Sequence, residues 1–200
     1  YYYGFYNAGR AYFNLKKNKE ALDCINNALN IDYSDSNVWI LKGDILWNLN
    51  KLHKAIESYD KAIEINPENA EAFATKGEIL WVLKRYDEAL ENLKKSLNID
   101  PEYIYPLLTK GKVYRALKSP EDALECFDKI LKIDNEYGEA WYEKGNVLNK
   151  LGNTEEAIKS YKNFIRNAPD HMKVIARTVK QYIPQLEKGK SVTFKPSKKT

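Results

Sequence analysis

The sequence predicts an all-α protein built from repeated helix pairs, and three observations carry this prediction. Glycine recurs every 34 residues, at Gly9, Gly43, Gly77, Gly111 and Gly145. An alanine series and a leucine series keep the same step: Ala21, Ala55, Ala89, Ala123 and Ala157, and Leu15, Leu49, Leu83, Leu117 and Leu151. Such a period is the signature of a repeat array, in which each unit buries its apolar face against its neighbours. The predicted units are 2–35, 36–69, 70–103, 104–137 and 138–171.

Within each unit, the residue spacing indicates two helices. The fourth, eighth and eleventh places hold a large apolar residue, the glycine, and Tyr or Leu, as in Phe5, Gly9 and Tyr12. Spacings of four and three place them on one helix face. The glycine costs ~1 kcal/mol inside a helix, and we expect it to let the second helix approach closely. That second helix carries the alanine at place 20 and a large residue at place 24: Ile25, Tyr59, Leu93, Phe127 and Tyr161.

Capping and breaking residues mark the helix boundaries. Ser119 before Pro120 is a predicted helix start, and Asn153 with Glu156 three residues later resembles a capping box. Pro67, Pro101 and Pro169 end the second helices.

The repeat pattern stops after residue 171. Residues 172–186 keep helical spacing of apolar residues, and a solenoid needs an atypical element over its last apolar face. We therefore predict a capping helix at 172–186, followed by a flexible basic tail at 187–200. The tail has five Lys and one Glu, which accounts for the whole formal net charge of +4 and leaves 1–186 neutral.

Composition narrows the class of protein. With 44% hydrophobic residues the chain can bury a core, and no apolar run approaches the ~20 residues that span a bilayer. The first residues show no signal peptide and no initiator Met, so we expect a segment of a longer cytoplasmic protein. Cys24 and Cys126 are expected to be reduced thiols.

No catalytic, cofactor or metal site is expected. His53 and His171 have no partner at ligand spacing, and the glycines lie inside helices instead of in phosphate-binding loops. The lysines at place 7, Lys42, Lys76, Lys110 and Lys144, are expected to cover apolar surface with their stems and keep their ammonium groups in water.

The pattern of aromatic, Gly, Tyr or Leu, Ala, aromatic and Pro over 34 residues resembles the tetratricopeptide repeat. This resemblance implies a right-handed α-solenoid superhelix of antiparallel helix pairs, with places 2, 5, 9, 12 and 13 of each first helix lining a concave groove. The implied function is non-catalytic binding of another protein's peptide segment. The candidate groove residues are Tyr3, Tyr6, Arg10, Phe13, Asn14, Asn37, Ile40, Asp44, Trp47, Asn48, Glu71, Glu78, Trp81, Tyr105, Leu108, Lys112, Arg115, Tyr142 and Asn146.

Trp47 and Trp81 are the expected anchors, because Trp, Tyr and Arg dominate binding hot spots. The alternative is that both rings pack against the adjacent unit as core. The expected groove is acidic around Asp44 and Glu78 and basic around Arg115, which favours a peptide of mixed charge.

One branch of the family clamps the C-terminal tail of heat-shock chaperones with Lys and Asn at places 5 and 9. Here these places read Tyr6 and Arg10, then Ile40 and Asp44, so no such tail is expected to bind. Self-association through open solenoid ends is the alternative function. Nucleic-acid binding, which rests on the basic tail, is a more distant one.

Overall fold

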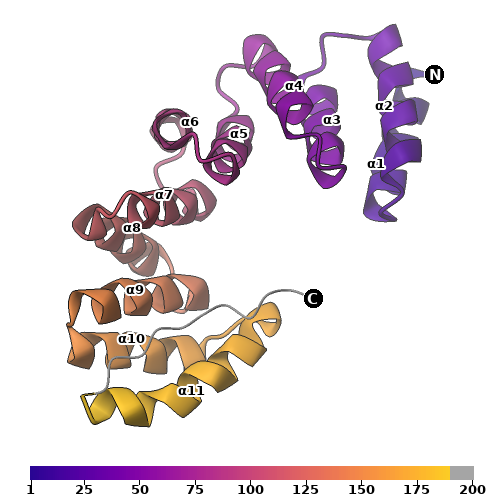
Figure 1. Ribbon diagram of the computed structural model, residues 1–200. Coiled ribbons are helices and arrows are strands. Elements are labelled where there is room, and N and C mark those ends of the chain that lie inside the picture. The colour runs from indigo at the N-terminus through magenta and orange to yellow at the C-terminus, as the bar shows by residue number, and fades with distance from the viewer. Residues whose placement is uncertain (190–200) are drawn as a thin grey trace. The chain divides into compact units, whose positions relative to one another are not determined.

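The computed structural model describes residues 1–189, which contain eleven α-helices, one 3-10 helix and no strand. The helices are α1 (Tyr2–Asn14), α2 (Asn18–Ile31), α3 (Ser36–Asn48), α4 (Leu52–Ile65), α5 (Ala70–Val82), α6 (Tyr86–Ile99), α7 (Ile104–Ala116), α8 (Pro120–Ile133), α9 (Gly138–Leu151), α10 (Thr154–Arg166), the 3-10 helix η1 (Asp170–Met172) and α11 (Lys173–Glu187). Consecutive helices pack as pairs, as Figure 1 shows for α3 with α4 and for α5 with α6. The predicted fold class, an α-solenoid of helix pairs, is confirmed.

The chain forms two compact units, Tyr1–Pro106 and Leu107–Thr200. In the first unit α2 packs against α3 and α4 against α5, and α1 also contacts α3. In the second unit α8 packs against α9 and α10 against α11.

The glycine at place 8 sets the distance between the two helices of a pair. A Cβ built on Gly43 would lie 2.7 Å from Cζ of Tyr59, and one on Gly111 would lie 2.5 Å from Cε1 of Phe127. Both aromatic side chains have no exposed surface. The expected close approach is therefore confirmed: a methyl group at this place would push the pair apart.

The turn between the two helices of each pair follows one geometry in all five repeats. Its central residue has a positive φ of 58° to 61° in four repeats and 83° in the fifth: Lys16, Asn50, Lys84, Lys118 and Gly152. In the first turn, Lys17 N–H donates to the carbonyl of Tyr12 and Lys16 N–H to that of Phe13. This is the Schellman arrangement, which satisfies the last carbonyls of the helix. Only the fifth repeat has the glycine that this conformation favours.

The predicted helix starts at Pro120 and Thr154 are confirmed, but not their side-chain caps. Ser119 and Asn153 occupy the N-cap positions, and neither side chain accepts a capping hydrogen bond.

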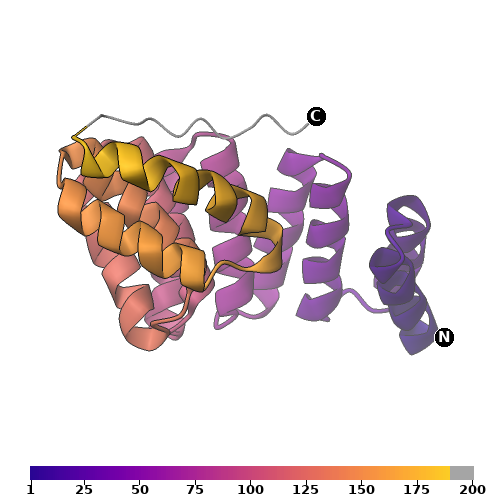
Figure 2. The ribbon, with the colours of Figure 1, turned by 90° about the horizontal axis from the view of Figure 1, so that it is seen from below.

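The predicted capping helix is α11, in the second unit. Its buried residues Ala176, Val179, Ile183 and Leu186 join one cluster with Tyr161 and Phe164 of α10. Figure 2 shows α11 lying along α10. The predicted basic tail falls differently: Glu187 ends α11 and pairs with Lys162 at 3.1 Å, and residues 190–200 lie outside the described part of the chain.

No helix among residues 1–189 combines the length and apolar character that crossing a membrane requires.

Candidate protein-interaction surfaces

The first-helix face of unit Tyr1–Pro106 carries the two predicted tryptophan anchors. Trp47 lies near the end of α3 and Trp81 near the end of α5. Both side chains are half-buried. Each of the two residues therefore keeps part of its surface accessible.

Carboxylates accompany the tryptophans on this face. The Tyr59 hydroxyl donates a hydrogen bond of 2.5 Å to Oδ1 of Asp44. Burial raises the pKa of Asp44 to about 6, against the lowering effect of the Tyr59 hydrogen bond, and the nearby Glu71 charge adds to the rise. Burial also raises the pKa of Tyr59, with contributions from the charges of Asp44, Glu71 and Glu78. The charges of three carboxylates of the first unit thus all affect the Tyr59 hydroxyl.

The remaining candidates of the first unit differ in exposure. Tyr3 is 74% exposed, and Arg10 lies 5.7 Å from the ring centroid of Tyr6. Arg10, Asn14, Asn37, Asn48 and Glu71 are exposed, and Tyr6, Phe13, Glu78 and Tyr105 are half-buried. These side chains fit an open or partly open surface.

The prediction that place 5 lines an open groove is wrong for Ile40 and Leu108. Ile40, in the first unit, is 8% exposed, and Leu108, in the second, is 5% exposed. Place 5 borders the packed face of the first helix. Removing a large aliphatic side chain from water there is favourable by ~25 cal/mol per Å², so these residues contribute to packing.

The prediction of a basic face in the second unit is also wrong. Nζ of Lys112 lies 2.7 Å from Oε1 of Glu139, and Arg115 forms an ion pair with Glu143. Glu143 is only 6% exposed. Burial raises its pKa, while the charges of Arg115 and Lys112 act in the opposite direction. The two cations are therefore compensated within the chain.

Sequence reasoning missed these pairs because each joins α7 to α9, so the partners lie 27 and 28 residues apart. The available signal was that Glu139 and Glu143 stand four residues apart on one helix face.

Tyr142 and Asn146, predicted to face the groove in the second unit, make contacts inside the protein. The Tyr142 ring lies 4.9 Å from that of Phe164, centroid to centroid. The Tyr161 hydroxyl donates a hydrogen bond of 3.0 Å to Oδ1 of Asn146. Both residues are half-buried, so packing accounts for much of what they do.

Two of the four lysines at place 7, Lys76 and Lys144, contradict the expectation of hydrated ammonium groups. Nζ of Lys76 lies 2.5 Å from Oδ1 of Asp60, and Nζ of Lys144 lies 2.5 Å from Oδ1 of Asp128. Each aspartate comes from the second helix of the preceding repeat, at place 25. These lysines tie successive repeats together.

Lys42 occupies the same place without such a partner. Place 25 of the repeat before it is Asn26, and among residues 1–189 Lys42 forms no ion pair. Its Nζ lies 4.9 Å from the centroid of the Trp39 ring, and burial lowers its pKa.

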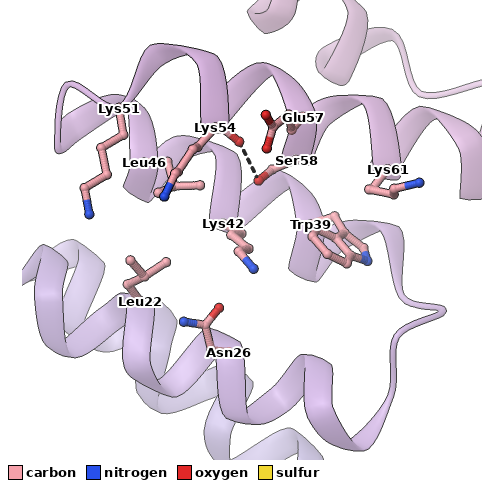
Figure 3. A pocket seen from close by; sticks show the side chains of 10 residues that line it. All are labelled: Leu22, Asn26, Trp39, Lys42, Leu46, Lys51, Lys54, Glu57, Ser58 and Lys61. Carbon is pink, nitrogen blue, oxygen red and sulfur yellow. Dashed lines mark hydrogen bonds between the residues drawn. The ribbon is translucent and has the colours of Figure 1, made fainter.

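Lys42 lines a pocket of about 650 Å³ between α2, α3 and α4. The pocket is lined by Leu22, Asn26, Trp39, Lys42, Leu46, Lys51, Lys54, Glu57, Ser58 and Lys61. Lys42 extends from α3 toward α2, which carries Asn26 (Figure 3). None of the predicted groove residues lines it. Comparing place 25 across the repeats, where Asp60 and Asp128 contrast with Asn26, was the signal that could have found it.

The described residues contain no group of three or more His, Cys, Asp or Glu side chains placed to hold a metal ion. Cys126 is buried, and burial raises the pKa of its thiol to about 11.

Three solved structures illustrate which proteins share this fold. PilF of Pseudomonas aeruginosa is 22% identical with a TM-score of 0.78, over 94% of this chain and 93% of that one. MamA of Desulfovibrio magneticus RS-1 is 19% identical with a TM-score of 0.76, over 83% of this chain and 94% of that one. YrrB, described as a TPR protein with an unusual peptide-binding site, is 21% identical with a TM-score of 0.69, over 88% and 90%. These likenesses show the fold.

Sequence comparison covers nearly the whole repeat region. No curated protein matches the chain. Family models described as tetratricopeptide repeat match residues 2–35, 36–69, 70–103 and 108–171. The 34-residue period, the glycine at place 8 and the paired helices all agree with those models, so the chain belongs to the tetratricopeptide repeat family.

Proposed function

We propose that this chain is a non-catalytic interaction module that binds a basic, apolar peptide segment of another protein on the first-helix face of unit Tyr1–Pro106. The tetratricopeptide fold is in general a protein–protein interaction module. The observation that carries the finer proposal is that Trp47 and Trp81 stay half-buried beside Asp44 and Glu78.

The charge of the face selects the peptide. Asp44, Glu71 and Glu78 act together on Tyr59, so a cationic side chain placed near them gains favourable electrostatic energy. The indole rings offer apolar and cation–π contacts to the same segment. A chaperone C-terminal tail, which ends in a carboxylate, would meet like charge on this face, and we expect it not to bind there.

Replacing Trp47 or Trp81 by Ala tests this proposal. A labelled peptide of about ten residues containing Arg and Leu is the probe, measured by fluorescence anisotropy. We expect each variant to lose at least ~10-fold in affinity, because buried aromatic anchors of an interface contribute on the order of 2 kcal/mol.

Trp141→Phe is the matched control, because Trp141 donates from Nε1 to the carbonyl of Asn135 in the second unit. Unchanged affinity in both alanine variants, or an equal loss in the control, would remove the first-helix face as the binding site.

Self-association is the second proposal, and it rests on α1. Tyr3 is 74% exposed and Leu15 is 66% exposed, which leaves apolar surface that a second copy could cover. Sedimentation velocity over a hundredfold range of concentration separates the proposals. A chain that stays monomeric at the highest concentration excludes self-association and leaves peptide binding in place.

A further inference from the structure

The pocket between α2, α3 and α4 concentrates positive charge. Four lysines and one glutamate line it, for a formal charge of +3. Lys61 pairs with Glu64 at 2.7 Å. Among residues 1–189, Lys42, Lys51 and Lys54 form no ion pair. Three ammonium groups therefore converge on this space without a carboxylate partner inside the described chain.

Lys42 differs from the other two, because it is half-buried whereas Lys51 and Lys54 are exposed. Moving a cation out of water is costly unless an anion or hydrogen-bond acceptor replaces the lost hydration. The Trp39 ring, 4.9 Å away, offers only the weaker attraction of an aromatic face. Burial lowers the pKa of Lys42, which agrees with an ammonium group that has lost water without gaining a nearby anion.

The protein itself shows which group completes this environment. At two of the three other junctions, the carboxylates of Asp60 and Asp128 lie 2.5 Å from the ammonium groups of Lys76 and Lys144. At the third, the residue in that position is Lys94, and the lysine at place 7 is Lys110. In the first repeat the residue at that position is Asn26. An amide is about as large as a carboxylate but carries no charge. The site therefore keeps its lysine and lacks its anion.

The apolar residues that line the pocket indicate which other groups the ligand carries besides its anion. Leu22, Leu46 and Trp39 supply apolar surface next to the lysines. A volume of about 650 Å³ lies within the range of sites that enclose small ligands, ~300–1,000 Å³. It is large enough for a few side chains, so a carboxylate flanked by an aliphatic residue satisfies both the charge and the apolar wall.

We propose that this pocket binds an acidic peptide segment of a partner protein, whose Asp or Glu carboxylate pairs with Lys42 in the place that Asp60 and Asp128 fill at two of the other junctions. This site lies outside the predicted first-helix face and does not depend on it. The same chain would then hold a basic segment on one surface and an acidic segment on another.

Asn26→Asp is the decisive variant, because it supplies the missing carboxylate from within the chain. The probe is a labelled peptide of about ten residues containing Asp and Leu, and its Asn-for-Asp counterpart is the negative control. We expect the wild-type chain to bind the Asp peptide, and Asn26→Asp to weaken binding at least ~10-fold, because the new carboxylate competes for Lys42. Lys42→Met should weaken it similarly.

Asn27→Asp is the charge-matched control. Asn27 is the next residue of α2, is exposed and does not line the pocket, so this variant adds the same charge outside it and should change affinity less than ~2-fold. An equal loss in both aspartate variants would reveal general repulsion and overturn the proposal. So would binding that neither Asn26→Asp nor Lys42→Met changes.

Inorganic phosphate gives a further arm. If phosphate shifts the Trp39 indole signal in NMR spectra and loses this effect in Asn26→Asp, while the Asp peptide does not bind, the pocket is a phosphate site and the proposal fails. Thermal unfolding of Asn26→Asp shows whether the variant is folded. We expect its Tm to be equal to or above that of the wild type, since it gains the ion pair that Lys76 and Lys144 form at their junctions.

Discussion

The first-helix faces of the two compact units handle their charges in opposite ways. In the second unit, Lys112 and Arg115 of α7 meet Glu139 and Glu143 of α9, so each cation has a carboxylate partner. In the first unit, Asp44 of α3 receives a neutral hydroxyl hydrogen bond from Tyr59, and the neighbouring Glu71 adds negative charge. The two cations of the second unit are paired with carboxylates, whereas Asp44 of the first unit is bonded to a neutral hydroxyl.

The electrostatic potential of a face therefore depends on which of its charged side chains form ion pairs within the chain, as well as on how many charged residues it contains. The sequence places acidic residues in the first unit and basic ones in the second. Only the structure shows that the basic residues are neutralised. A ligand is therefore expected to sense Asp44 and Glu71 of the first unit more strongly than the paired cations of the second.

Arg115→Met removes the ion pair between α7 and α9 and is expected to have the largest effect on stability. It leaves Glu143 buried without its main counter-charge, and removing one partner of a fully buried pair costs ~3–5 kcal/mol. Because the Arg115 side chain is 38% exposed, we expect a smaller loss of about 2 kcal/mol in the free energy of unfolding at pH 7. Urea denaturation measures this loss.

The loss should shrink at lower pH. The pKa of Glu143 is already raised by burial, and removal of Arg115 raises it further, so the folded variant takes up a proton more readily than the unfolded chain. Stability then increases as the pH falls through that pKa. Lys129→Met is the control, since it breaks an ion pair of the same unit in which both side chains, Lys129 and Glu125, are exposed. A loss of similar size in this control would show that the burial of Glu143 is not the cause.

Asp44→Asn removes the partly buried charge of the first unit and is expected to have a smaller effect on stability. Asp44 has its pKa raised to about 6, so the folded state binds its proton between about pH 4 and 6, where the unfolded state releases it. The contribution of Asp44 to stability is therefore unfavourable at pH 7 and is relieved as the pH falls through about 6. Asparagine carries no charge at either pH.

We expect Asp44→Asn to stabilise the protein by about 1–2 kcal/mol at pH 7 and by much less at pH 4, as measured by urea denaturation. Asp23→Asn, at an exposed aspartate of α2, is the matched control. An Asp44→Asn variant whose stabilisation is the same at both pH values would contradict the assignment. Binding of the basic peptide should weaken in the same variant.

The helix pairs could be predicted from sequence because they depend on spacing inside one repeat. Gly43 faces Tyr59 because a glycine at place 8 and a large residue at place 24 meet in every hairpin. The helix α11 lies where apolar residues keep helical spacing after the repeat pattern ends. These features need no knowledge of how one repeat is rotated against the next.

The candidate site depends on that rotation and was predicted less well. Ile40, a predicted groove residue, is buried, and Arg115, at the centre of the predicted basic region, is paired with Glu143. Whether Lys42 or Lys76 finds a carboxylate is decided by one residue of the preceding repeat, Asn26 or Asp60. The leucine at place 14 shows the same limit: it follows the last residue of α1, α3 and α5 alike, yet Leu15 is 66% exposed whereas Leu49 and Leu83 are half-buried.

The lysine–aspartate pairs at place 7 and place 25 restrict how this array can be rearranged. Each pair spans a junction, so it depends on which repeat comes first. A shuffled chain that set repeat 36–69 directly before repeat 138–171 would present Asp60 to Lys144, whereas repeat 2–35 in that position would present Asn26. The repeats share one backbone plan, but the charges at their edges give the series a preferred order, and they are not freely interchangeable modules.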